Sequence, residues 1–230
     1  MAVILAIETS AHVCSVTLWS NGKELALKES AEANAHSKTL TIMILDLLKE
    51  AAFTGKNIDA VAVSKGPGSY TGLRIGVSVA KGLCYGWSKP LIAVDTIKAQ
   101  GAFFIRKNPE HADNLLCPLF DARRMEVYTA LYKSDLSEIL PVQAMIIDEN
   151  SFEFFLKENK IAFFGTGAEK CKEIIKHPNA FFVNDISPSS SGVAVLAEDM
   201  FIKKEFADVA YFEPYYLKEF IAGKPSRKVI

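Results

Sequence analysis

The sequence has few cysteines and no excess charge of one sign, and each shortage limits what the chain can do. Its four cysteines lie far apart and form no C-x-x-C pair: Cys14, Cys84, Cys117 and Cys171. We expect them to be reduced core residues, because neither a disulfide framework nor a zinc site has this spacing. Lys and Arg (26) balance Asp and Glu (27), so no overall basic field attracts the chain to nucleic acid or membrane.

Long apolar runs and clustered metal ligands are also missing. The chain has no apolar run of about eighteen residues and no basic segment at its start, so we expect a soluble, cytoplasmic protein without a membrane partner. The four histidines form neither H-x-x-x-H nor H-E-x-x-H, and no metal site is predicted. The nucleophile elbow G-x-S-x-G is absent as well, which gives no support to serine hydrolase chemistry.

Apolar residues make up half of the chain, and their spacing predicts the same order of elements twice. Strands are expected at 3–8, 13–19 and 24–30, a helix at 36–52, a strand at 58–64, a helix at 69–87 and a strand at 90–94. After a polar connection at 106–114, strands follow at 115–121, 125–132, 142–147, 161–164 and 180–183, with helices at 151–158, 168–176 and about 189–203.

Two copies of β-β-β-α-β-α are typical of the actin, Hsp70 and sugar-kinase architecture, in which two related lobes flank a cleft. We therefore predict an α/β protein with an ASKHA fold. Its lobes are expected to comprise residues 1–104 and 105–230, with a tail that is able to pack back on the first lobe.

The helix at 69–87 has an unusual surface. Leu73, Val77, Ala80 and Cys84 form an ordinary core stripe, whereas four glycines occupy much of the remaining surface. Each glycine costs about 1 kcal/mol relative to alanine in a helix, so close packing must offset the loss. This pattern predicts that another helix lies directly on the glycines.

The helix at 36–52 carries Ile42 and Leu45 on the side opposite its core stripe, so the two helices together predict a small apolar patch. Two such patches related by a twofold axis would form a four-helix contact. The alternative is that the second lobe or a crossing loop covers both helices. The expected partner interface consists of Ile42, Leu45, Lys49, Gly72, Arg74, Ile75, Gly76, Val79, Gly82 and Gly86.

Two turns and two glycines are candidates for a nucleotide site. In the actin-like fold, the turns at Glu8-Thr9-Ser10 and at Asp121 would face the phosphates and metal across the cleft, and Gly165 and Gly167 would lie near the adenosine. Neither turn has the D-x-G form of the kinases. The loop at 66–72 fits neither G-x-x-x-x-G-K-[ST] nor G-x-G-x-x-G, so a tight turn with close helix packing is favoured there.

The segments ILAIETS, KGPGSYTGLRIGVSVAKGL and PLIAVDTI resemble the bacterial TsaB family, also called YeaZ, and FDAR and EPYYL extend the resemblance more loosely. The resemblance implies a noncatalytic subunit, without a cofactor of its own, needed to make threonylcarbamoyladenosine in tRNA. It also implies a TsaD-like catalytic partner and a TsaE-like ATPase, with ATP and tRNA engaged through the complex. The apolar patch of the two helices predicts a homodimer when the chain is alone, with the equivalent helices of the TsaD-like partner replacing the second copy in the complex.

The resemblance also bears on metal binding. TsaD carries a metal-binding H-x-x-x-H after its glycine helix, and the matching positions here are Thr96 and Gln100, which cannot replace two imidazoles. The rival hypothesis is an independent ATP-dependent kinase or acyl-transferring enzyme that uses the interlobe cleft. Saturable nucleotide binding by the isolated chain would separate the two hypotheses.

Overall fold

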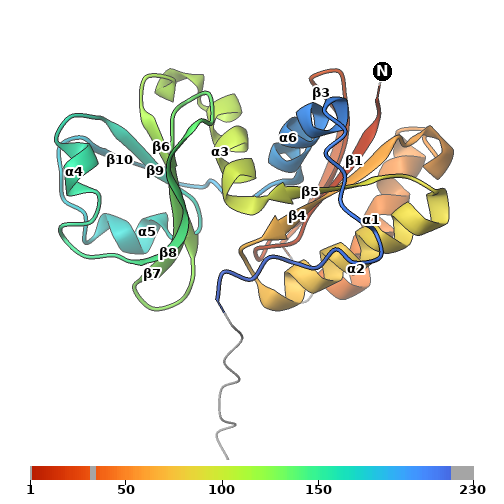
Figure 1. Ribbon diagram of the computed structural model, residues 1–230, viewed down its shortest axis with the longest axis horizontal. Helices are drawn as coiled ribbons and strands as arrows, with labels where there is room; N and C mark the ends of the chain where they lie inside the picture. The colour runs from red at the N-terminus through yellow and green to blue at the C-terminus, as the bar shows by residue number, and fades with distance from the viewer. Residues whose placement is uncertain (1, 32–34, 219–230) are drawn as a thin grey trace, which may run out of the picture.

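Two five-stranded mixed sheets form the frame of the molecule, one in each lobe (Figure 1). The computed structural model describes residues 2–31 and 35–218. The first sheet has the order β3-β2-β1-β4-β5, with strands β1 (Ile4–Glu8), β2 (Cys14–Ser20), β3 (Lys23–Ser30), β4 (Ala60–Gly66) and β5 (Leu91–Asp95). The second has the order β10-β9-β6-β7-β8, with β6 (Leu115–Asp121), β7 (Glu126–Tyr132), β8 (Glu138–Ile146), β9 (Ile161–Phe164) and β10 (Ala180–Val183).

The two sheets have the same topology, which confirms the predicted duplication. In each, the first strand pairs antiparallel with the second and parallel with the fourth. The helices are α1 (Ala35–Glu50), α2 (Tyr70–Trp87), α3 (Thr96–Lys107), α4 (Glu153–Leu156), α5 (Ala168–Lys172) and α6 (Ser190–Ile202), and one-turn 3-10 helices occupy Gly55–Asn57 and Pro109–His111. Each half therefore reads βββαβαβα, one strand and one helix longer than the unit predicted.

Alternating side chains of each strand build cores on both faces of its sheet. In β1, Leu5 and Ile7 pack with α1 and α2, whereas Ile4 and Ala6 pack with α6. In the second lobe, α3 covers one face of the sheet, and α4 and α5 cover the other. The lobes are thus layered as helices, sheet, helices, sheet and helices (Figure 1).

Helix α3 corrects the sequence analysis, which assigned no helix to residues 96–107 and took 106–114 as a polar connection. The Asp95 carboxylate caps this helix by accepting a hydrogen bond from the Lys98 amide at 3.0 Å. Ile97 and Phe104 are fully buried, and the Phe104 ring stacks on Phe164 with centroids 3.8 Å apart. Packing between the lobes, rather than a strong apolar period, stabilises this helix.

The two sheets fall on either side of the expected boundary at residues 104 and 105, but two later segments return to the first lobe. Helix α6 packs on the first sheet and crosses α3 at Gly192, where a Cβ atom would lie 2.2 Å from the Ala99 carbonyl oxygen. Residues 207–218 then run along α2 (Figure 1). The lobes are therefore not two continuous sequence segments, and no single domain boundary divides the chain between them.

All four cysteines are free and buried, as the sequence predicts. Within residues 2–31 and 35–218, no helix has the length and apolar character needed to cross a bilayer.

Candidate interlobe cleft and partner surface

The carboxyl ends of β1 and β4 face those of β6 and β9 across a cleft of about 1040 Å³ between the lobes. Ligands of open α/β sheets bind at this end of the strands, so the cleft is the natural place to test for a site. Its walls come from the β1–β2 turn, the start of α2, the turn after β6, the loop after β9 and residues 215–218.

The start of α2 forms the first-lobe wall. The Ser69 hydroxyl caps the helix by accepting a hydrogen bond from the Gly72 amide at 3.2 Å, and the Ser69 amide donates to the Ser10 carbonyl at 2.7 Å. A Cβ atom on Gly72 would lie 2.0 Å from the Thr9 carbonyl oxygen, and one on Gly76 would lie 2.2 Å from Thr9 Oγ1. Glycine is therefore required where the helix lies directly on the β1–β2 turn.

This contact corrects the predicted partner interface. Gly72 and Gly76 are buried within their own lobe, so the expectation that another helix covers them is wrong. Gly82 and Gly86, by contrast, are exposed, and a Cβ atom on either would meet nothing within 4 Å. The four glycines thus divide into an inner pair and an outer pair.

Glu8 lies beneath the β1–β2 turn rather than in the cleft. Its carboxylate accepts hydrogen bonds from the Ser10 amide at 2.6 Å and the Ser64 hydroxyl at 2.9 Å. Its side chain is 1% exposed, and burial raises the pKa of the carboxyl despite these hydrogen bonds. Of Glu8, Thr9 and Ser10, only Ser10 lines the cleft.

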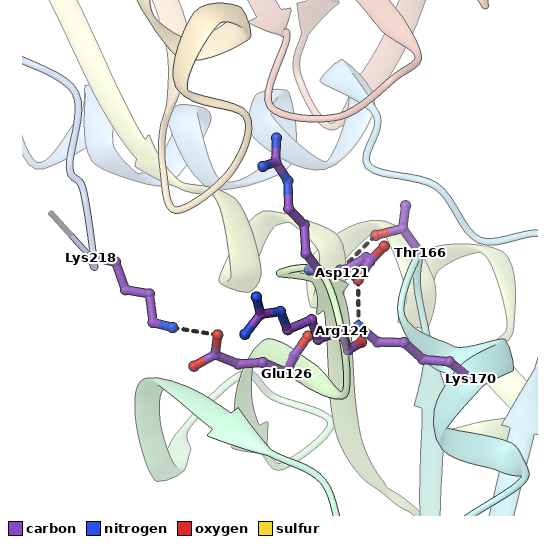
Figure 2. A network of polar contacts seen from close by, with 7 residues as sticks. Asp121, Arg124, Glu126, Thr166, Lys170 and Lys218 are labelled. Atoms are coloured by element: carbon purple, nitrogen blue, oxygen red, sulfur yellow. Dashed lines mark hydrogen bonds and ion pairs between the residues drawn. The ribbon is translucent and has the colours of Figure 1, made fainter. Parts of the chain in front are cut away.

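Asp121 lines the second-lobe wall, but its carboxylate is already paired. Figure 2 shows the Lys170 ammonium forming an ion pair with Asp121, and Lys170 also donates to the carbonyls of Arg124 at 2.8 Å and Glu126 at 2.7 Å. The Asp121 amide donates to Thr166 Oγ1 at 3.0 Å. Lys170 therefore both closes the turn and neutralises the carboxylate expected to face a metal.

Gly165 and Gly167 hold the loop after β9 against neighbouring backbone. Gly165 has φ +108°, and a Cβ atom there would lie 2.5 Å from Gln100 Nε2. One on Gly167 would lie 2.9 Å from a Val127 methyl carbon. Thr166 lines the interlobe cleft, but neither Gly165 nor Gly167 does. The sequence therefore predicted the correct loop but not the residue in it that faces the cleft.

Thr96 and Gln100, which match the two histidines of the TsaD metal motif, are buried in contacts within the protein. Thr96 is buried and its hydroxyl accepts a hydrogen bond from the Gly66 amide at 3.0 Å, which joins α3 to the end of β4. Gln100 is 1% exposed and lies against Gly165. Among the residues that the structure describes, no three His, Cys, Asp or Glu side chains gather where they could hold a metal ion.

The sequence analysis allowed the tail to pack back on the first lobe, as residues 207–215 do, but it did not predict that the segment also lines the cleft. Tyr215, Tyr216 and Lys218 line the cleft, and the Tyr215 amide donates to the Lys65 carbonyl at 2.7 Å. The EPYYL motif marks this segment in the sequence, but nothing in its composition predicts that it reaches both lobes.

The outer surfaces of α1 and α2 retain most of the predicted partner interface. Ile42 and Leu45 are 55% and 66% exposed, and Arg74 turns aside to donate to the Tyr216 hydroxyl at 3.1 Å. We call the remaining surface the α1–α2 face; it consists of Ile42, Leu45, Lys49, Ile75, Val79, Gly82 and Gly86.

Comparison with known proteins identifies the family. The chain is 32% identical to the tRNA threonylcarbamoyladenosine biosynthesis protein TsaB of Escherichia coli over 96% of each chain, and 30% identical to that of Bacillus subtilis over 94% of this chain and 93% of the relative. The chain belongs to the TsaB family. YeaZ from Pseudomonas aeruginosa superposes with a TM-score of 0.80 at 25% identity, covering 94% of this chain and all of that one.

A family model gives a second match to this chain. Residues 29–222 match a family model described as TsaD, tRNA N6-adenosine threonylcarbamoyltransferase, and the chain belongs to that family too. The resemblance noted in the sequence is thereby confirmed over nearly the whole chain, including the second half, where its motifs were sparse.

Proposed function

We propose that this chain acts in the biosynthesis of tRNA threonylcarbamoyladenosine as a noncatalytic subunit that activates a TsaD-like catalytic partner. The observation that carries the proposal is the match to TsaB proteins along almost the full length of both chains. Matching lengths mean that the shared unit is the whole two-lobed fold rather than one exchangeable domain.

The chemistry of the cleft supports a role without catalysis. Glu8 is buried under hydrogen bonds, and Asp121 is paired with Lys170, so neither carboxylate is presented as a ligand for a phosphate-bound metal. The pair at Thr96 and Gln100 lacks the imidazoles of the TsaD motif. The rival hypothesis is an independent ATP-dependent kinase or transferase. Such an enzyme would need the turns at Glu8 and Asp121 to hold a metal ion and the phosphates of the nucleotide.

The α1–α2 face supplies a surface for the partner. Ile42 and Leu45 are exposed on α1, and Gly82 and Gly86 on the neighbouring α2 have open space above them, which would let a second helical layer approach α2 closely. We propose that two copies pair through this face in isolation, that a TsaD-like subunit replaces the second copy, and that a TsaE-like ATPase joins the resulting complex. ATP and tRNA are engaged through that complex.

Reconstitution tests the proposal. We expect tRNA modification to require this chain together with TsaD-like and TsaE-like proteins, ATP, tRNA and the enzyme that forms threonylcarbamoyl-adenylate. Omission of this chain should abolish product, and the chain alone should form none. Equal rates with and without the chain would contradict the assignment.

Metal analysis and nucleotide titration separate the proposal from its rival. We expect the purified chain to contain no stoichiometric zinc or iron and to show no saturable ATP binding by calorimetry. One equivalent of tightly bound metal whose removal abolishes activity, or saturable ATP binding by the isolated chain, would favour the rival.

A further inference from the structure

Residues 207–218, which we call the strap, run from the first lobe to the second, and Ala207, Val209 and Phe212 pack against the edge of the first-lobe core. The Ala207 amide donates to the Leu91 carbonyl at 2.8 Å, which sets the strap against the edge strand β5. Lys81 Nζ then donates to the carbonyls of Ala210 and Phe212, each at 3.0 Å. The strap therefore lies along the polar side of α2, beside the α1–α2 face.

Aromatic and backbone contacts fix the strap at the edge of the cleft. The Tyr216 and Tyr70 rings lie 4.9 Å apart between centroids, and Arg74 lies over the Tyr70 ring at 4.1 Å. Gly66 permits the approach, because a Cβ atom there would lie 2.3 Å from the Tyr215 carbonyl oxygen. These contacts all belong to the first lobe.

Lys218 makes the connection to the second lobe. Its ammonium forms an ion pair with Glu126, beside the turn that Lys170 closes (Figure 2). The Lys218 side chain is 47% exposed and that of Glu126 is 19% exposed, so solvent reaches the pair from the Lys218 side and its opening requires little free energy. The strap thus combines a firm attachment to one lobe with a weak attachment to the other.

We propose that the strap is a gate over the interlobe cleft, and that the Lys218–Glu126 pair is its latch. Opening the latch frees the strap end near residue 218 from the second lobe while Tyr215 and Tyr216 stay in place. The strap also rests on α2, through Lys81 and Arg74, so the helix that contributes to the α1–α2 face also holds the gate.

The test measures entry to the cleft with a single reactive thiol. His12 is exposed and lines the cleft, so His12→Cys places a reporter there. The native cysteines are poor competitors, because burial raises the pKa of Cys14 to about 12 and those of Cys84 and Cys171 to about 11, and also raises that of Cys117. The quantity compared is the labelling rate with a bulky neutral maleimide divided by that with N-ethylmaleimide.

In this background, Lys218→Glu and Glu126→Lys should each raise the ratio roughly two- to fivefold, the size expected for an exposed ion pair. The double reversal, Lys218→Glu with Glu126→Lys, should restore the parent value. The matched control is Lys157→Glu, which breaks another exposed second-lobe pair, with Glu153 at 3.0 Å, and should change nothing.

Unchanged ratios in both single variants, or a double variant as open as the singles, would overturn the gate. If a variant does not fold, salt supplies the same perturbation to the His12→Cys protein. Raising the ionic strength from about 0.01 M to about 1 M shortens the screening length from about 30 Å to about 3 Å and should raise the ratio. A ratio that salt does not move would likewise contradict the latch.

Discussion

At the scale of single residues, the glycines of α2 have two distinct roles. Gly76 is needed because Thr9 Oγ1 occupies the space that a Cβ atom would take, whereas Gly82 faces open space. We expect Gly76→Ala to lower the free energy of unfolding by about 1–3 kcal/mol through overpacking. Gly82→Ala, the matched control on the same helix, should raise it by up to about 1 kcal/mol. Urea denaturation measures both, and equal effects would contradict the distinction.

Glu8 gives a second prediction at this scale. Burial raises its pKa in the folded protein, so folding favours the protonated carboxyl. Its contribution to stability should be fully present below the ordinary carboxyl pKa of about 4.3 and lost as the pH rises through the higher folded value. Glu8→Gln keeps an acceptor for the Ser10 amide but does not titrate.

Comparing urea unfolding of the parent and Glu8→Gln from about pH 4 to neutrality isolates this effect from the other carboxyls. The stability of the variant relative to the parent should increase with pH. A constant difference between the two proteins would show that Glu8 has the same pKa folded and unfolded.

Sequence spacing predicts which turns line the cleft, but it does not predict that the carboxylate of one turn forms an ion pair. The actin-like fold predicted Ser10 and Asp121 at the cleft, at the end of the first strand of each half, and both line it. Lys170 lies 49 residues from Asp121, and no local pattern reports a contact over that distance. The state of a carboxylate at such a site therefore depends on tertiary structure that the sequence pattern does not contain.

At the scale of elements, regular apolar spacing predicts helices and strands well where one face packs inside one lobe. Helix α2 follows this rule, since Leu73, Val77, Ala80 and Cys84 are all buried. Helix α3 does not, because it packs between both lobes and carries buried polar residues such as Thr96 and Gln100 beside Phe104. Its position is fixed by contacts with α6 and the second sheet, which explains why local spacing missed it.

The α1–α2 face gives the prediction at the element scale. Leu45→Glu would place a charge in a desolvated contact, and Gly82→Leu would fill the space between approaching helices, so each should weaken self-association about tenfold or more. Gly82 is tested rather than Gly76, because a side chain at Gly76 would disturb the turn at Thr9 within the same lobe.

Light scattering over a concentration series measures this association. Ile202→Glu is the control, because Ile202 is 72% exposed on α6, across the first sheet from α1 and α2. Folded Leu45→Glu and Gly82→Leu variants that associate like the parent protein would place the interface elsewhere.

At the scale of the whole molecule, the chain joins its lobes three times within residues 2–31 and 35–218. Helix α3 follows the first sheet and packs on the second, α6 follows the second sheet and packs on the first, and the strap returns along α2 to Lys218. These crossings link the two walls of the cleft to the same helices, so the proposal that a partner binds the α1–α2 face and the proposal of a gate over the cleft concern connected parts of one structure.

The use of one face for both associations leads to the last prediction. If the homodimer and the complex with a TsaD-like subunit share the α1–α2 face, the two must exclude each other. Titrating the TsaD-like protein into the homodimer should then yield a species with one copy of each chain at that face, while the homodimer signal falls in proportion. Light scattering measures the mass of the homodimer and of the mixed complex, and a label on one subunit shows which chains each species contains.

The Leu45→Glu variant should lose both associations together, and Ile202→Glu should keep both. A complex that still contains the intact homodimer contact, or a variant that loses one association and keeps the other, would show that the two surfaces are separate.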